Sequence, residues 1–187
     1  MKNLSLLVVI GCLFFATMSV NAQTQFKPFR VDLGLGVAIP QDGIGFVFNV
    51  EPKYAVIPQL SVGLKIEADA IVKDLVIDKS GDIAEGTGQG VFSILAVADY
   101  HLMQKSFRPF VGGGFGIYSI AAGDMDTSST SDIEGKTNFG AMLRAGFDVS
   151  HFRLALAYNF AGKDNLNNKA DFFSITVGAY FGGGRRK

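Results

Sequence analysis

Residues 137–160 read TNFGAMLRAGFDVSHFRLALAYNF, and this stretch contains the pattern that decides the fold. Apolar residues occupy every second position in two runs, Thr137–Val149 and His151–Phe160. The positions between them hold small, polar or charged residues, including Arg144 and Arg153. An alternation with a period of two places the two classes on opposite faces of a strand. The stretch therefore predicts a hairpin with one apolar face and one polar face.

The same alternation recurs in six further runs, and no charged residue falls on the apolar register of any run. Each run has about ten residues or more, which lets a tilted strand cross a bilayer, whereas strands of soluble proteins average about 5–6 residues. The polar register is rich in Gly, Ala, Ser and Asn, which suit a narrow closed interior. The eight predicted strands are Phe29–Ile39, Gly45–Tyr54, Leu60–Val72, Gly90–Leu102, Phe107–Ser119, Thr137–Val149, His151–Phe160 and Phe172–Phe181.

The predicted connections alternate between short and long. Short turns are expected at Ala55–Gln59, Met103–Ser106 and Ser150–His151, and longer polar loops at Lys73–Gln89, Ala121–Lys136 and Ala161–Asp171. The first connection, Pro40–Ile44, departs from this alternation because it is also short. Short turns at one end and long loops at the other are typical of outer-membrane barrels, which keep the turns in the periplasm.

These patterns predict an all-β fold, an eight-stranded antiparallel up-and-down transmembrane β-barrel. Closure pairs every backbone group, which hydrocarbon requires. Aromatic residues near the strand ends predict two girdles at the membrane interfaces. The periplasmic girdle would contain Tyr54, Tyr100, Phe107, Phe147, Phe152 and Phe181, and the outer girdle Phe46, Phe92, Phe139, Tyr158, Phe160 and Phe173. Ordinary core packing of these rings is the alternative interpretation.

The composition excludes several classes of protein. The chain has 187 residues, which fits one domain, and 23 of them are Gly. Lys plus Arg equals Asp plus Glu at 17 each, so no basic surplus indicates a nucleic-acid partner. The apolar content is too high and the net charge too low for a disordered chain. Beyond the N-terminal segment, no run of about 20 apolar residues predicts a membrane helix.

Residues 1–22 are predicted to be a secretory signal peptide, followed by the barrel over residues 23–181 and a short basic tail, 182–187. A positive start, an apolar run from Leu4 and the small residues before Gln23 support cleavage after Ala22. An N-terminal membrane anchor is the alternative. Cleavage removes the single Cys and Lys2, which leaves the mature chain without a disulfide and with one acidic residue in excess.

The chain resembles the family of small outer-membrane β-barrels, of the eight-stranded type of the OmpA transmembrane domain and OmpX. The resemblance rests on the signal ending Val20-Asn21-Ala22, the glycine-rich strand from Arg108 to Gly116, and the closing strand Phe173–Phe181. It implies a Gram-negative outer-membrane location with the N-terminus in the periplasm. It also implies recognition of the closing strand by the barrel-assembly machinery. Lipid and lipopolysaccharide of the outer membrane are the implied surroundings.

The interior register carries six basic and six acidic residues, which predicts an ion-pair network, because buried charges persist only when paired. Lys65, Glu67, Asp69 and Arg144 should lie nearest the middle of this network. We expect a plugged lumen, with a gated pore whose pairs exchange partners as the alternative. The twelve residues are Arg30, Lys53, Lys65, Arg108, Arg144 and Arg153, with Asp32, Glu51, Glu67, Asp69, Asp99 and Asp148.

Catalytic and cofactor chemistry has little support in the sequence. The two histidines, His101 and His151, are expected as polar residues near the periplasmic turns. The stretch from Asp124 to Gly135 begins like a calcium loop but lacks the required Gly and Glu. No cofactor and no metal site are expected. The leading interpretation is a non-enzymatic barrel with a structural or interaction role through its extracellular loops, possible partners including an extracellular protein.

Three other functions stay open. The first is a small porin-like pore, passive or gated, for ions and small solutes. The second is a lipid-modifying outer-membrane enzyme. The third is a soluble lipocalin-like barrel, which would require the opposite polarity, apolar inside and polar outside.

Overall fold

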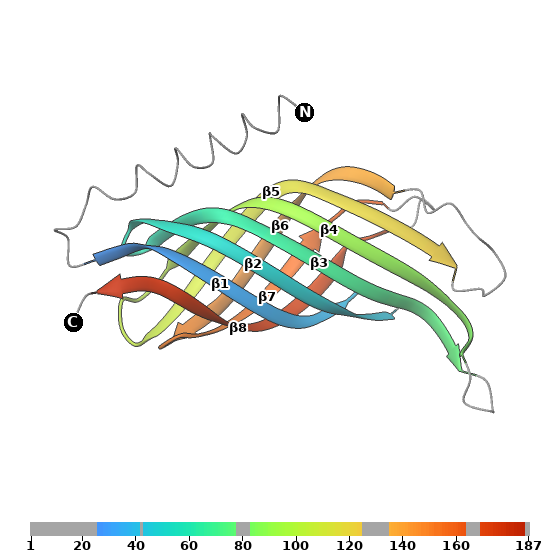
Figure 1. The fold of residues 1–187 in the computed structure, drawn as a ribbon, viewed down its shortest axis with the longest axis horizontal. Coiled ribbons are helices and arrows are strands. Elements are labelled where there is room, and N and C mark those ends of the chain that lie inside the picture. Colours follow the sequence, from blue (N-terminus) through green and yellow to red (C-terminus); the bar gives the residue numbers. More distant parts are fainter. Residues whose placement is uncertain (1–25, 42, 78–82, 125–134, 164–168, 186–187) are drawn as a thin grey trace, which may run out of the picture. The chain divides into compact units, whose positions relative to one another are not determined.

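The computed structural model describes residues 26–41, 43–77, 83–124, 135–163 and 169–185. Eight antiparallel strands pair in chain order and close into a barrel, which Figure 1 shows. No helix in these ranges is long and apolar enough to cross a membrane. The predicted signal peptide lies outside the described residues. The strands are β1 (Phe26–Ile39), β2 (Gly43–Ile57), β3 (Leu60–Ile77), β4 (Ile83–His101), β5 (Phe107–Asp124), β6 (Gly135–Val149), β7 (Phe152–Phe160) and β8 (Phe172–Arg185).

The two faces of the strands separate as predicted. Along β4, the side chains from Val91 to His101 alternate strictly between buried and exposed. Outward-facing apolar residues are widely exposed, with Phe139 at 77% and Leu143 at 63%. Charged side chains lie inside instead. This polarity is the inverse of a soluble lipocalin-like barrel, so that alternative is wrong, and it matches a barrel surrounded by lipid.

The aromatic residues of the two predicted girdles face outward. All of them are exposed except Phe147 and Phe173, which are half-buried. Phe107 and Phe147 contact each other on this outer surface, with ring centroids 5.4 Å apart. Ordinary core packing is therefore not their role.

Strand pairing extends into two of the predicted loops. β3 and β4 continue to pair through Lys73↔Thr87 and Val76↔Glu85, which reduces the connection predicted at Lys73–Gln89 to residues 78–82. β5 and β6 likewise reduce the connection at Ala121–Lys136 to residues 125–134. These segments were predicted as loops because they are polar. Polar side chains do not prevent backbone hydrogen bonding, so the strands continue to pair there.

The connections define the two ends of the barrel. The short turns after β2, β4 and β6 lie at one end, which we call the turn end, and the other connections at the loop end. The tightest turn is Ser150–His151, where Val149 pairs with Phe152. Ser150 has a φ of 54°, the left-handed conformation that such a two-residue hairpin requires.

Candidate functional site in the barrel interior

The barrel interior has two chemically distinct parts. An apolar cluster fills the part toward the loop end and reaches into the middle. An ionic cluster occupies the part toward the turn end. The apolar cluster consists of Ala38, Val47, Ile71, Val91, Leu95, Val97, Tyr118, Ile120, Met142, Ala157, Ala161, Ala170 and Phe172. The ionic cluster consists of Arg30, Asp32, Glu51, Lys53, Asp99, His101, Arg144, Asp148 and Arg153, all of them buried.

Asp99 of β4 is the centre of the ionic cluster. Arg144 of β6 donates to both of its oxygens, through Nε at 2.7 Å and Nη2 at 3.0 Å. Lys53 Nζ and Arg153 Nη2 donate to Asp99 Oδ2 at 2.9 and 2.7 Å. The remaining Arg144 nitrogen, Nη1, donates to both oxygens of Glu51 at 2.8 and 2.9 Å. These bonds join β2, β4, β6 and β7 across the lumen.

A second centre lies at Asp148 of β6. Arg30 Nη1 donates to Asp148 Oδ2 at 2.8 Å and Arg153 Nη1 to Oδ1 at 3.2 Å. Arg30 also bonds Asp32 of its own strand at 2.8 Å. Two guanidinium groups stack on rings, Arg153 on Phe110 at 3.8 Å and Arg30 on Tyr180 at 4.5 Å. Each buried charge in this part thus has several partners, which offsets its loss of hydration.

The four residues expected at the middle of the network divide into separate contacts. Lys65 pairs with Glu67 at 2.5 Å, and Asn49 also donates to Glu67 at 3.4 Å. Arg144 contacts neither of them and bonds Glu51 and Asp99 instead. Asp69 is buried, and neither of its oxygens has a hydrogen-bond partner in the described structure. Lys65 and Glu67 therefore form a separate ion pair on the loop-end side of the ionic cluster.

Residues 8–181 match the family described as "Outer membrane protein beta-barrel domain". The match covers most of the chain, and the closed eight-stranded barrel agrees with it. The chain belongs to this family.

Solved structures similar to this barrel domain are small outer-membrane barrels. Neisserial surface protein A (NspA) superposes with a TM-score of 0.56 at 16% identity, covering 84% of this chain and 96% of the other. The outer membrane protein Ail of Yersinia pestis, in a phospholipid bilayer nanodisc, gives a TM-score of 0.52 at 15% identity, covering 82% and 99%. No curated protein matches the chain significantly. At these identities the likeness shows the fold alone.

His101 belongs to the ionic cluster of the barrel domain, a role that the sequence analysis missed. Its Nε2 lies 3.0 Å from Asp148 Oδ2, and its ring packs on Phe110. The signal was present, because His101 shares the inward register of Asp99 two residues before it. The sequence predicts only a polar residue near a turn at this position. His151 is exposed and stacks on Tyr180 at 5.7 Å, as a residue of the turn.

Arg108 differs from the other predicted interior charges. It is half-buried, and its Nη2 donates to the carbonyl oxygen of Pro58 at 3.1 Å, in the turn between β2 and β3. Arg108 comes second in β5, at the edge of the barrel, where a turn carbonyl is within reach. The buried charges of the described interior are therefore five basic and six acidic residues.

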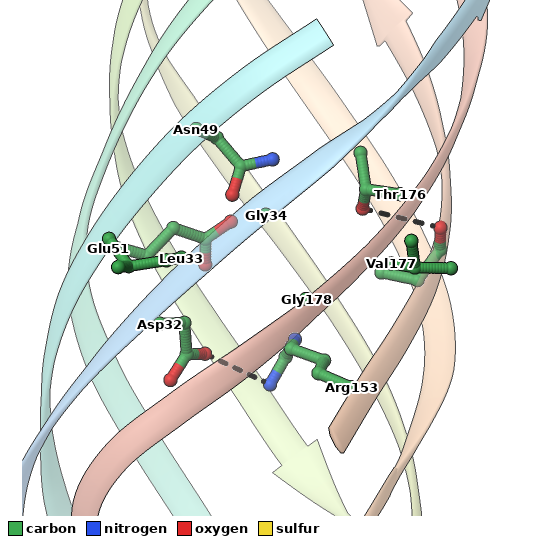
Figure 2. A pocket seen from close by; sticks show the side chains of 10 residues that line it. Asp32, Leu33, Gly34, Asn49, Glu51, Arg153, Thr176, Val177 and Gly178 are labelled. Carbon is green, nitrogen blue, oxygen red and sulfur yellow. Dashed lines mark hydrogen bonds and ion pairs between the residues drawn. The ribbon is translucent and has the colours of Figure 1, made fainter. Parts of the chain in front are cut away.

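A small cavity lies beside the ionic cluster, between β1, β2, β7 and β8 (Figure 2). Its volume is about 10 Å³, which holds about one water molecule, and Asp32 and Arg153 line it. Figure 2 shows Gly34 and Gly178 on its wall. This cavity is too small for a substrate. Elsewhere in the described ranges, no three His, Cys, Asp or Glu side chains are placed to hold a metal ion.

Proposed function

We propose that this outer-membrane barrel acts through its surface, in a structural or interaction role, without enzymatic activity. The single observation that carries the proposal is the filled interior. The apolar cluster occupies the lumen toward the loop end, and the ionic cluster joins opposite walls toward the turn end. An eight-stranded barrel is just wide enough for its side chains to fill it. The function then belongs to the outer surface and to the connections at the loop end.

The loop-end connections would face the cell exterior, with the N-terminus in the periplasm, as for barrels whose short turns are periplasmic. Outer-membrane lipid and lipopolysaccharide would contact the exposed apolar belt, and an extracellular protein could bind the loops. The barrel-assembly machinery would recognise the closing strand, in which Phe173, Ile175 and Val177 alternate with polar residues.

The proposal is tested in a deletion strain complemented with either of two variants. One is the full chain, and in the other residues 78–82, 125–134 and 164–168 are replaced by short Gly-Ser turns. The readout is sensitivity of the outer membrane to detergent and to a large antibiotic. Rescue by the full chain alone assigns the function to the loops, and rescue by both assigns it to the barrel as a structural part. Failure of both variants, although each is folded in the membrane, would contradict the proposal.

A gated pore is the second candidate, and the pair Lys65–Glu67 is the observation that favours it. This pair lies apart from the ionic cluster, and exchange of Lys65 between carboxylates could open a path. Single-channel conductance in planar bilayers distinguishes a pore from a closed barrel. It is measured for the wild-type protein and for the variants Lys65→Ala and Arg144→Ala. Silence of all three folded proteins supports a closed barrel. Discrete steps in wild type that these substitutions alter would establish the pore.

A further inference from the structure

Five buried side-chain oxygen atoms without a hydrogen-bond partner lie close together inside the described part of the barrel. They are on β3 and β4, which are adjacent strands (Figure 1). They belong to four side chains, whose exposure ranges from 0% for Ser93 to 5% for Asp69. None of these oxygens has a hydrogen-bond partner in the described structure. The five atoms are Glu67 Oε1, Asp69 Oδ1, Asp69 Oδ2, Gln89 Oε1 and Ser93 Oγ.

The register of β3 and β4 places these side chains next to one another. Asp69 pairs with Val91, so its diagonal neighbours on β4 are Gln89 and Ser93. Glu67 pairs directly with Ser93. Directly paired residues have Cβ atoms about 4.5–5.5 Å apart and diagonal ones about 7–8 Å, distances that these side chains can span. The four residues alternate with outward-facing ones, so all point into the lumen.

The charge balance of the interior shows a deficit at the same place. In the ionic cluster, Arg30, Lys53, Arg144 and Arg153 match Asp32, Glu51, Asp99 and Asp148 in number. On the loop-end side of the ionic cluster, the described interior holds two buried carboxyl groups, Glu67 and Asp69, and one buried cation, Lys65. The Lys65 ammonium is held by Glu67 Oε2 and lies 3.5 Å from Met142 Sδ. The carboxyl group of Asp69 is left without a partner in the described structure.

His101 cannot supply the missing charge. It is paired with Asp148, and it lies ten residues along β4 from Val91, the partner of Asp69. At about 3.3 Å per residue, that separation is about 33 Å. A buried, uncompensated carboxylate is too costly to persist, so Asp69 must be neutralised, either by a proton or by a bound cation.

The geometry points to a binding site for one small monovalent cation of the Na⁺ class, formed by Glu67, Asp69, Gln89 and Ser93. Carboxylate, amide and hydroxyl oxygens are the ligands of hard cations. A single positive charge balances Lys65, Glu67 and Asp69, whereas a divalent ion leaves an excess. The cation is bound as the barrel closes and is released on unfolding.

The test is the urea unfolding of the refolded protein in lipid vesicles at pH 8, at constant ionic strength. NaCl is replaced stepwise by N-methyl-D-glucamine chloride, whose cation is too large for the site. If the folded state binds one Na⁺, the urea midpoint of unfolding rises with the Na⁺ concentration. Near saturation of the site, the logarithm of the unfolding equilibrium constant falls by one unit for each tenfold increase in Na⁺ concentration. Equal midpoints in the two salts overturn the site and assign the charge to a proton or to a cationic side chain.

Two variants separate the site from general stability. In Asp69→Asn, the dependence on Na⁺ disappears and the midpoint in N-methyl-D-glucamine is at or above that of wild type, because the uncompensated charge is gone. In Glu51→Gln, a control within the ionic cluster, the midpoint falls but the Na⁺ dependence is unchanged. A dependence that persists in Asp69→Asn, or is lost in Glu51→Gln, contradicts the assignment.

A crystal of the folded protein grown in Tl⁺, a heavy monovalent cation, gives a direct readout. We expect an anomalous peak in contact with Asp69 and Gln89 oxygens, and none there in Asp69→Asn crystals. An empty map at this position in wild type overturns the proposal.

Discussion

Asp99 is fully buried in the barrel, and Lys53, Arg144 and Arg153 all donate to its carboxylate. With lipid outside the barrel and packed side chains inside, little water is available to solvate these cations if the Asp99 carboxylate is lost. Loss of a buried partner costs more than the pair itself contributes, because the remaining charges become uncompensated. Asp99 of β4 accepts hydrogen bonds from β2, β6 and β7, more than any other carboxylate of the ionic cluster.

Asp99→Asn should therefore destabilise the barrel by about 3–5 kcal/mol, the usual cost of breaking a buried ion pair. Urea unfolding in lipid vesicles measures it. The matched control is Lys169→Ala, which removes the exposed Lys169 ammonium from its pair with Asp171 at 3.3 Å and should cost no more than about 1 kcal/mol. Similar losses in the two variants would show that the ionic cluster carries no special share of stability.

Most residues of the ionic cluster could be predicted from the sequence, but their pairing could not. The alternation of each strand fixes which residues point inward, and all nine members lie on inward registers. Which inward residues meet depends on contacts across the lumen, such as Arg144 with Glu51 of β2. Such contacts follow from closure and stagger, which no local pattern contains. For that reason Arg144 was expected beside Glu67 and Asp69, and the partners of His101 were missed.

Among the elements, β5 and β6 show how large and small residues share a narrow lumen. A Cβ added at Gly140 would lie 2.7 Å from Tyr118 Cδ2, and one at Gly146 would lie 2.8 Å from Phe110 Cζ. The two rings of β5 thus occupy the space beside glycines of β6. Small residues on the polar register were expected to suit the narrow interior, and these two β6 glycines make room for β5 side chains.

Gly140→Val should displace the Tyr118 ring and destabilise the barrel by about 1–3 kcal/mol, the usual cost of overpacking. The hydrogen bond from Tyr118 Oη to Asn159 Oδ1, at 3.1 Å, would be lost with it. The control is Gly90→Ala on β4, where an added Cβ meets nothing within 4 Å. That change should be neutral or stabilising by up to about 1 kcal/mol. Both are measured from unfolding midpoints, and an unaffected Gly140→Val would mean that the ring has room to move.

The β6–β7 hairpin depends on one residue with positive φ. Ser150→Ile should destabilise the protein by about 1–2 kcal/mol, since a β-branched residue is disfavoured at φ 54°. Ser150→Asn should leave stability nearly unchanged, because Asn tolerates this conformation. The same unfolding assay distinguishes the two. Equal stability of both variants would show that the turn relaxes to another conformation.

At the scale of the whole molecule, the outer surface determines where the barrel can exist. Leu143 lies at the middle of β6, outward and 63% exposed, whereas Ile44 lies near the loop end of β2, also 63% exposed. Leu143→Arg should cost about 2–4 kcal/mol in a bilayer, and Ile44→Arg about 0–1 kcal/mol, because the penalty falls toward the interface. Folding into vesicles gives both values. A reversed order would place the membrane belt elsewhere on the barrel.

The first and last strands of this chain are neighbours, and that has a kinetic consequence. At their junction, a Cβ added at Gly178 of β8 would lie 2.9 Å from Gly34 Cα of β1. The two residues are separated by nearly the whole barrel sequence, so their pairing carries the largest loop-closure entropy of any strand pair. Topologies with such distant contacts fold slowly. Until β1 pairs with β8, the backbone groups of two strand edges stay unpaired, and a partly closed barrel is therefore unstable in the hydrocarbon core of the membrane. Insertion into the membrane and closure of the barrel are therefore expected to be a single concerted event.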